Sequence, residues 1–216
     1  MKSVNLDIWS DIACPWCWIG KRHLAAALRD IELDVAIRWH AFELDPGAPR
    51  DVPEAYDYVA RLATKYRVST NDAEAMIARM VAAGAASGVT MRFDRVRPSN
   101  TFDAHRLLAW AGDDDLATQG RLKERLFQAY LGEGRVMADH ETLIELVAEI
   151  GLDTAAAAAV LRSDRYAAAV RMDEDFAARR GIQGVPSFVI DQRALLTGAQ
   201  PPDVIARALA QAAATS

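Results

Sequence analysis

Cys14-Pro15-Trp16-Cys17 holds the residues of this chain best placed to do chemistry. Its two cysteines are the only ones among 216 residues, and two positions separate them. Residues 4–10 have the alternating pattern of a half-buried strand, and residues 18–29 have helical spacing. The pair therefore falls where a strand passes into a helix. A C-x-x-C at such a junction predicts a dithiol–disulfide redox site.

The start of a helix also accounts for the reactivity of such a pair. A thiol there lies beside unpaired backbone N–H groups and the positive end of the helix dipole, and both stabilise a thiolate. We expect Cys14 to cap the helix, to be exposed and to attack a disulfide as a thiolate. We expect Cys17 to face inward and to resolve the mixed disulfide by attacking Cys14.

Pro15 and Trp16, between the cysteines, are candidate substrate-binding residues. Proline is favoured in the first turn of a helix, where its missing N–H would be unpaired anyway. Trp16 carries no charge, so it supplies no charge-assisted hydrogen bond to a thiolate, and we expect a reduction potential within about −120 to −270 mV. The indole could hold a peptide or an aromatic compound, or it could simply pack.

Val185-Pro186, just before a second apolar run, is the other candidate binding element. Only about 5–6% of X-Pro bonds in folded proteins are cis, but paired with a C-x-x-C this proline predicts a cis bond. The bond would place the preceding backbone beside the cysteines. The N–H and C=O of Val185 could then pair with an extended peptide, as an added strand does.

A metal site is the main chemical alternative for the cysteine pair. A structural zinc site needs four ligands, and the chain has no further cysteine. Its histidines show no close H-x₃₋₅-H spacing; they are His23, His40, His105 and His140. We therefore expect no metal.

Composition narrows the partners and the compartment. The net charge of −5 gives no reason to expect nucleic acid. No apolar run approaches the ~18 residues that a membrane span needs. No secretory signal is visible at the N-terminus, so we expect a cytoplasmic protein with no membrane partner. Paired cysteines in that compartment are more often catalytic, redox-sensing or metal-binding than structural.

The order of the predicted elements indicates one interrupted α/β fold. Strands are predicted at 4–10, 33–44, 185–190 and 194–197, with a final helix over 203–213. Residues 53–180 read as helical, with helix starts predicted at Asn71 (a capping box with Glu74), Asp139, Asp153 and Asp164. We therefore predict a discontinuous α/β domain, 1–52 with 181–216, and a helical insertion domain, 53–180.

Several segments together resemble the DsbA-like proteins of the thioredoxin superfamily, and within them the FrnE subfamily. They are residues 11–20, Phe42-Glu43-Leu44, residues 100–107, residues 184–188 and residues 198–202. The resemblance implies a thioredoxin-like fold, a central mixed sheet flanked by helices, with a large helical insertion after the second strand. It also implies that Cys14 and Cys17 are the redox pair and Pro186 the cis-proline. The chain departs from secreted DsbA enzymes at Trp16, where they usually have histidine, and it lacks the second cysteine pair of some FrnE relatives.

The predicted function is thiol–disulfide exchange on protein or small-molecule disulfides. It needs no cofactor beyond the redox-active disulfide; glutathione is a possible reductant, and the recycling partner is unspecified. Two alternatives stay open on the same fold. One is a glutathione-dependent isomerase or transferase of a small aromatic compound, like 2-hydroxychromene-2-carboxylate isomerase. The other is a non-redox peptide-binding or chaperone module.

Polar residues near these motifs have both a functional and a structural interpretation. A buried Asp7 or Asp11 could relay a proton to Cys17, although aspartates are usually exposed. Asn100, Asp103 and His105 could shape a groove, while capping and packing of one helix is the simpler account. The remaining candidates are weaker: Glu43 and His40 on the second strand, and His23, which helical spacing turns away from Cys17.

Overall fold

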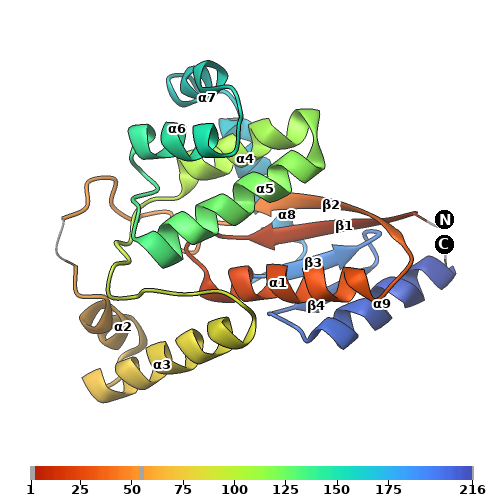
Figure 1. Cartoon of the computed structure of the whole chain (residues 1–216), viewed down its shortest axis with the longest axis horizontal. Helices are drawn as coiled ribbons and strands as arrows, with labels where there is room; N and C mark the ends of the chain where they lie inside the picture. Colours follow the sequence, from red (N-terminus) through yellow and green to blue (C-terminus); the bar gives the residue numbers. More distant parts are fainter. Residues whose placement is uncertain (1–2, 54–55, 216) are drawn as a thin grey trace.

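The computed structural model describes residues 3–53 and 56–215, and its centre is a mixed four-stranded sheet (Figure 1). The strand order is β2-β1-β3-β4. β1 (Ser3–Ser10) pairs in parallel with β2 (Asp34–Ala41) and antiparallel with β3 (Ser187–Ile190), which pairs antiparallel with β4 (Ala194–Thr197). The predicted fold class is confirmed. β2 ends three residues earlier than predicted, because the backbone N–H of Leu44 turns to the Asp11 side chain.

Helices cover both faces of the sheet. α1 (Pro15–Arg29) and α9 (Pro202–Thr215) lie on one face, where Leu6 and Ile8 of β1 share a core with Leu24 and Leu209. α8 (Ala167–Arg179) covers the other face, where Trp9 of β1 stacks on Phe176. The split follows from the two-residue period of a strand, which sends neighbouring side chains to opposite faces.

The helical insertion follows β2, as predicted, and it contributes most of the helices. They are α2 (Tyr58–Tyr66), α3 (Thr70–Ala86), α4 (Phe102–Asp114), α5 (Leu116–Phe127), the π-helical turn η1 (Gln128–Glu133), α6 (His140–Glu149), α7 (Thr154–Leu161) and α8. Figure 1 shows α2 and α3 beside the N-terminal end of α1, and α4 to α7 above the sheet. The domain borders at 52/53 and 180/181 stay a prediction, and residues 1–2, 54–55 and 216 of those ranges lie outside the described residues.

Helix starts follow the predicted caps at α6 and α7, whereas the cap predicted at Ser99 or Asn100 is wrong, since Thr101 is the N-cap of α4. Asp139 and Asp153 each accept hydrogen bonds from two backbone N–H groups at the starts of α6 and α7. Ser69 caps α3, so the prediction of Asn71 is wrong by two positions; the Ser69 hydroxyl accepts from the backbone of Asp72. α8 begins after Tyr166, which takes a left-handed conformation, so the prediction of Asp164 is also wrong.

α1 belongs to two hydrophobic cores at once. Its C-terminal half packs on the sheet, while Cys14, Cys17 and Trp18 at its start belong to the core of the insertion, with Phe127 of α5. The cysteine pair therefore lies where the insertion meets the sheet unit. In the described part of the chain, no helix is long and apolar enough to cross a membrane.

Candidate active site

Cys14 caps α1, as the spacing predicts, but it is not exposed. Its backbone is extended, Pro15 begins the helix, and the Cys17 N–H donates to the Cys14 carbonyl oxygen at 3.1 Å. Both cysteines are free thiols. Cys17 is fully buried and Cys14 is 4% exposed. The expected exposed nucleophile is therefore corrected to one that meets solvent only through a cavity.

The surroundings of Cys14 act on its ionisation in opposite directions. The Cys17 thiol and burial raise the pKa of the Cys14 thiol in this reduced arrangement, whereas a backbone hydrogen bond from Cys17 lowers it. The helix start by itself favours a thiolate. Burial disfavours the charged form of a thiol, so Cys14 holds its proton more tightly than an exposed cysteine does. The low Cys14 pKa expected from the sequence is not found in this state.

The cis-proline prediction is confirmed, and the bond lies against Cys14. Val185-Pro186 is a cis peptide bond. The Cys14 thiol donates to the Val185 carbonyl oxygen at 3.5 Å. Gly20 on α1 allows this close approach, because a Cβ there would lie 3.0 Å from Pro186 Cγ. Gly20 is a positioning residue that sequence reasoning missed, since only the packed structure shows what its missing side chain makes room for.

A cavity of about 370 Å³ opens beside Cys14, and we call it the Cys14 pocket. Pro15, Trp16 and Val185, three of the four predicted substrate-binding residues, line it, whereas Pro186 does not and packs against Gly20. Trp16 is 43% exposed, so it borders the opening and does not fill a core. The rest of the lining is largely aromatic and aliphatic and comes from the insertion: Tyr58, Leu62, Tyr66, Met76, Met80 and Tyr130.

Asp11 is buried, so the simpler interpretation of it as an exposed loop acid is wrong. It is 1% exposed, and its carboxylate accepts from the backbone N–H groups of Ala13 at 3.2 Å and Leu44 at 2.8 Å. His105 Nε2 lies 3.4 Å from the same carboxylate. Burial works against the charge, but His105 and the two backbone donors outweigh it and lower the pKa of Asp11. Burial lowers the pKa of His105, although the neighbouring Asp11 opposes this shift.

Lys123 is a buried cation near the cysteines that sequence reasoning did not find. It lies on α5, is fully buried, and donates to the Ser10 carbonyl oxygen at 3.2 Å. Its ammonium also lies 5.0 Å from the centre of the Phe127 ring. Burial lowers the pKa of Lys123 to about 8, against the opposing attraction of Cys17, Asp11 and Cys14 when these are negative. Its place in an amphipathic helix carries no sequence signal, because lysines in such helices are usually exposed.

Asp7 and His40 lie on β1 and β2, against α8, and not at the cysteine pair. His40 Nε2 contacts Asp7 at 2.8 Å, and His40 Nδ1 contacts Asp173 of α8 at 2.6 Å. Burial opposes the imidazolium, but these two carboxylates outweigh it and raise the pKa of His40 to about 9. The group therefore ties α8 to the sheet, and Asp7 is unavailable as a proton relay to Cys17.

The other weighed residues separate into structural roles. Asn100 Oδ1 accepts from the backbone N–H of Phe102 at the start of α4, and Asn100 Nδ2 lies 3.3 Å from Glu43. Asp103 forms ion pairs with Arg50 and Arg106 and contacts His140. His105 alone of this motif reaches the site, through Asp11. Lastly, His23 Nδ1 contacts the Gln200 carbonyl oxygen, away from the cysteines.

Comparison with known proteins gives one family over nearly the whole chain. The family model described as "DSBA-like thioredoxin domain" matches residues 5–210. A crystal structure described as the probable DsbA oxidoreductase SCO1869 from Streptomyces coelicolor is 36% identical, with a TM-score of 0.88 over 99% of this chain and 91% of that one. The protein YwbO of Bacillus subtilis (strain 168) is 26% identical over 96% of both chains. A 2-hydroxychromene-2-carboxylate isomerase structure, 16% identical, has a TM-score of 0.70 over 96% of this chain and 95% of that one, and shares the fold.

Proposed function

We propose that this chain, which belongs to the DSBA-like thioredoxin domain family, is a thiol–disulfide oxidoreductase of the FrnE type that works through Cys14 and Cys17. The observation that carries the proposal is the position of the Cys14 thiol. It lies at the start of α1, 3.5 Å from the carbonyl oxygen of Val185, and lines a cavity that opens to solvent. A thiol in that position can be reached by a disulfide in the cavity.

The exchange needs only the two cysteines. The Cys14 thiolate attacks one sulfur of a substrate disulfide, the substrate S–S bond breaks, and the second substrate sulfur leaves and takes up a proton. Cys17 then loses its proton and attacks Cys14, which releases the first substrate sulfur and leaves a Cys14–Cys17 disulfide. Two electrons pass to the substrate. A thiol reductant such as glutathione returns the pair to its reduced form, and the same steps in reverse oxidise a dithiol.

Two buried charges near the pair act on a thiolate in opposite directions. Cys17 is fully buried, so its thiolate has no water to stabilise it. The Lys123 ammonium attracts a thiolate at either cysteine. Asp11, held as a carboxylate by its hydrogen bonds, repels one at Cys14. The two opposite charges thus set how much thiolate the reduced pair carries, which in turn sets the reduction potential.

Two features of the site support a protein or peptide substrate. Among the described residues, no acceptor pairs with the backbone N–H of Val185, so this N–H is free for an extended chain. A peptide laid along the cis-proline loop would gain main-chain hydrogen bonds of the kind that an added strand makes. Trp16 borders the same opening and offers an apolar face to the side chain next to the reacting sulfur.

Trapping with Cys17→Ala tests the proposal. Without Cys17 the mixed disulfide on Cys14 has no resolving thiol, so we expect covalent adducts with disulfide substrates that dithiothreitol releases, seen by mass spectrometry. The control Cys14→Ser should trap nothing, and the wild type should reduce insulin. No adduct on Cys17→Ala together with no insulin reduction by the wild type would refute the proposal.

The same variants separate the glutathione-dependent isomerase alternative, which rests on a shared fold alone. An isomerase that uses glutathione as cofactor does not need the resolving cysteine. Its signature would be glutathione binding together with turnover of an aromatic substrate that survives Cys17→Ala. We expect neither, because the pair is complete and both thiols meet at one helix start.

A further inference from the structure

We infer that the substrate is an acidic peptide disulfide, held in a groove that continues from the Cys14 pocket along α2, with its carboxylates on Lys65 and Arg79. This rests on the proposed function and names the substrate class of the same site. The groove is formed by the Cys14 pocket and a second hollow of about 660 Å³ that adjoins it. Leu44, Asp45, Arg61 and Lys65 line both hollows, so the two are continuous along that wall.

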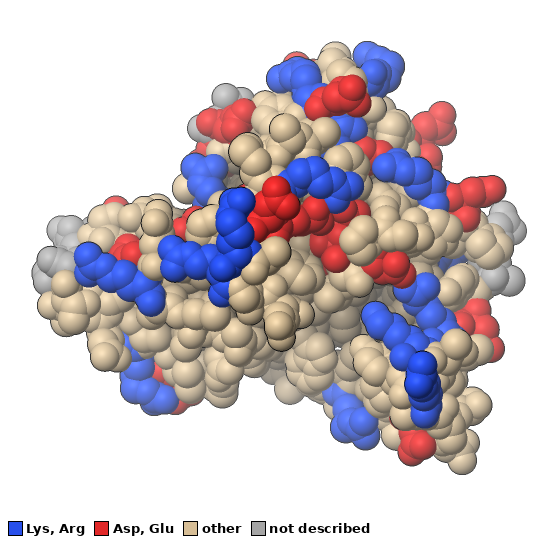
Figure 2. All heavy atoms as spheres, turned by 180° about the vertical axis from the view of Figure 1, so that it is seen from behind, with Lys and Arg blue, Asp and Glu red and all other residues tan. Residues whose placement is uncertain are grey.

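The charges of the groove are the reverse of those of the chain. The whole protein has a net charge of −5, but the Cys14 pocket is lined by Arg61, Lys65 and Arg79 against one acid, Asp45. The second hollow adds one more acid, Asp57, so cations still outnumber acids along the groove. Figure 2 shows basic side chains gathered on the lobe that α2 and α3 form, among mostly uncharged ones. A local positive field on a negative protein favours a negative ligand and speeds its association.

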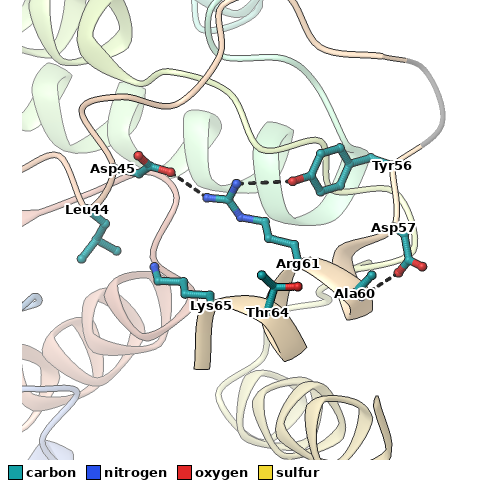
Figure 3. Close-up of a pocket in the computed structure, with 8 residues that line it drawn as sticks. All are labelled: Leu44, Asp45, Tyr56, Asp57, Ala60, Arg61, Thr64 and Lys65. Atoms are coloured by element: carbon teal, nitrogen blue, oxygen red, sulfur yellow. Dashed lines mark hydrogen bonds and ion pairs between the residues drawn. The ribbon is translucent and has the colours of Figure 1, made fainter. Parts of the chain in front are cut away.

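Two of the three cations are available to a ligand. Arg61 is held in place, since its guanidinium bonds Asp45 at 2.8 Å and the Tyr56 hydroxyl at 3.3 Å (Figure 3). Lys65 and Arg79 are exposed, and no acidic side chain of the described residues pairs with either. In Figure 3 the Lys65 amino group extends from α2 toward Leu44 and Asp45, along the wall between the two hollows.

The groove also suits a chain with apolar side chains among its acids. Three of the large hydrophobic residues that are exposed line the Cys14 pocket, namely Trp16, Leu44 and Tyr66. A cluster of exposed hydrophobic side chains marks a surface that binds a partner or a ligand. The second hollow extends the groove beyond Leu44. A small thiol compound bound at Cys14 would leave this second hollow empty. The length of the groove, its exposed apolar residues and its two available cations, Lys65 and Arg79, together point to a peptide.

Matched peptide disulfides test the inference. Two fluorogenic peptides with one disulfide each would differ only in carrying Glu or Gln beside the cysteines. We expect kcat/KM for the Glu peptide to exceed that for the Gln peptide by about five-fold at low salt, from two partly exposed ion pairs. The ratio should fall toward one at about 1 M salt, where charges are screened.

Variants of the groove localise the effect. Lys65→Gln with Arg79→Gln should bring the Glu-to-Gln ratio close to one. Arg162→Gln, an exposed arginine that ends α7 at the opposite end of the molecule in Figure 1, should leave the ratio unchanged. Ala60→Trp would fill the second hollow, which Ala60 lines without reaching the Cys14 pocket. It should lower kcat/KM for the peptides while sparing glutathione disulfide.

The outcomes distinguish this inference from the proposed function. Equal rates on the Glu and Gln peptides, both dependent on Cys14, would overturn the inference and leave the oxidoreductase standing. Suppose that kcat/KM is higher for glutathione disulfide than for the Glu peptide, and that Ala60→Trp changes neither value. This result would overturn the inference of a peptide substrate in favour of a small anionic disulfide. No turnover of any disulfide would remove both.

Discussion

Lys123→Met replaces a buried ammonium with an uncharged side chain of similar length and tests the electrostatics beneath the cysteine pair. Lys123 is fully buried, with one hydrogen bond, to the Ser10 carbonyl oxygen. An ammonium in such a place costs folding free energy, because water no longer stabilises it. The cost is full at a pH below the folded pKa of Lys123, and it is lost as the pH rises toward the pKa of a free lysine.

The size of the effect follows from the two pKa values of Lys123. The folded pKa is about 8, against 10.5 for a free lysine. The unfolded chain therefore binds more protons than the folded one between these values, so the contribution of Lys123 to stability rises with pH over that window. At about 1.4 kcal/mol per pKa unit, the gain from pH 7.5 to pH 10 is roughly 2 kcal/mol. Lys123→Met lacks this gain.

Urea unfolding followed by tryptophan fluorescence measures the effect. Both proteins would carry Cys14→Ser and Cys17→Ser, so that no thiol titrates. Removing the two thiols also removes their attraction for the ammonium, which lowers the pKa of Lys123 further. The free energy of unfolding of this background, relative to Lys123→Met, should therefore increase by at least roughly 2 kcal/mol between pH 7.5 and pH 10. Lys65→Met, an exposed position on α2, is the matched control. A difference that stays constant over this range would refute the argument from burial.

The same substitution in the protein with both cysteines has a second readout. Because the ammonium favours the thiolate form of the reduced pair, its loss should make reduction less favourable. The reduction potential, measured by glutathione titration and mass spectrometry, should become more negative, with about 30 mV for each ~1.4 kcal/mol of lost stabilisation. A potential that stays the same or becomes less negative would contradict the role given to Lys123.

Two further substitutions test the surroundings of the site. The pKa of His40 is raised from 6.5 to about 9, so the stability that His40 contributes to the fold is complete below pH 6.5 and is lost as pH rises through 9. The difference in free energy of unfolding between wild type and His40→Gln should shrink by roughly 3 kcal/mol from pH 6 to pH 10. A difference that does not change with pH would contradict the ion pairs of His40. Gly20→Ala should force the Pro186 ring away from α1, lower the free energy of unfolding in urea by about 1–3 kcal/mol and reduce the rate of insulin reduction. Gly120→Ala is its control, because a Cβ at Gly120 would lie 3.8 Å from Trp39 Nε1, its nearest neighbour outside α5.

Local patterns were sufficient for the framework of the fold. The strand at 4–10 follows from alternation, and the strand at 194–197 follows as the partner of the apolar strand before the turn at Asp191-Gln192. The caps at Asp139 and Asp153 follow from side chains that satisfy their own helix starts. Ser69 shows the limit of such reasoning. Ser69, Thr70 and Asn71 are all residue types that cap helices, so the local pattern does not say which of them begins α3.

Electrostatics was where sequence reasoning failed. Asp11 and Lys123 are 112 positions apart in the chain, and each has the pattern of an exposed residue. Their burial depends on α5 of the insertion packing against the sheet unit, a contact that no local pattern encodes. The enclosure of Cys14 depends on another part of the insertion, because α2 and α3 contribute much of the lining of its pocket.

The sequence by itself determined the C-x-x-C pair, Cys14 and Cys17 at a strand-to-helix junction, and a proline at 186 able to take the cis form. These are features of short segments, and short-range geometry fixes them. Only the tertiary structure decided that Cys14 is enclosed, that a carboxylate and an ammonium lie buried near it, and that cations border its pocket. Burial and charge proximity are properties of segments brought together from across the chain, and they set the chemistry of the thiols.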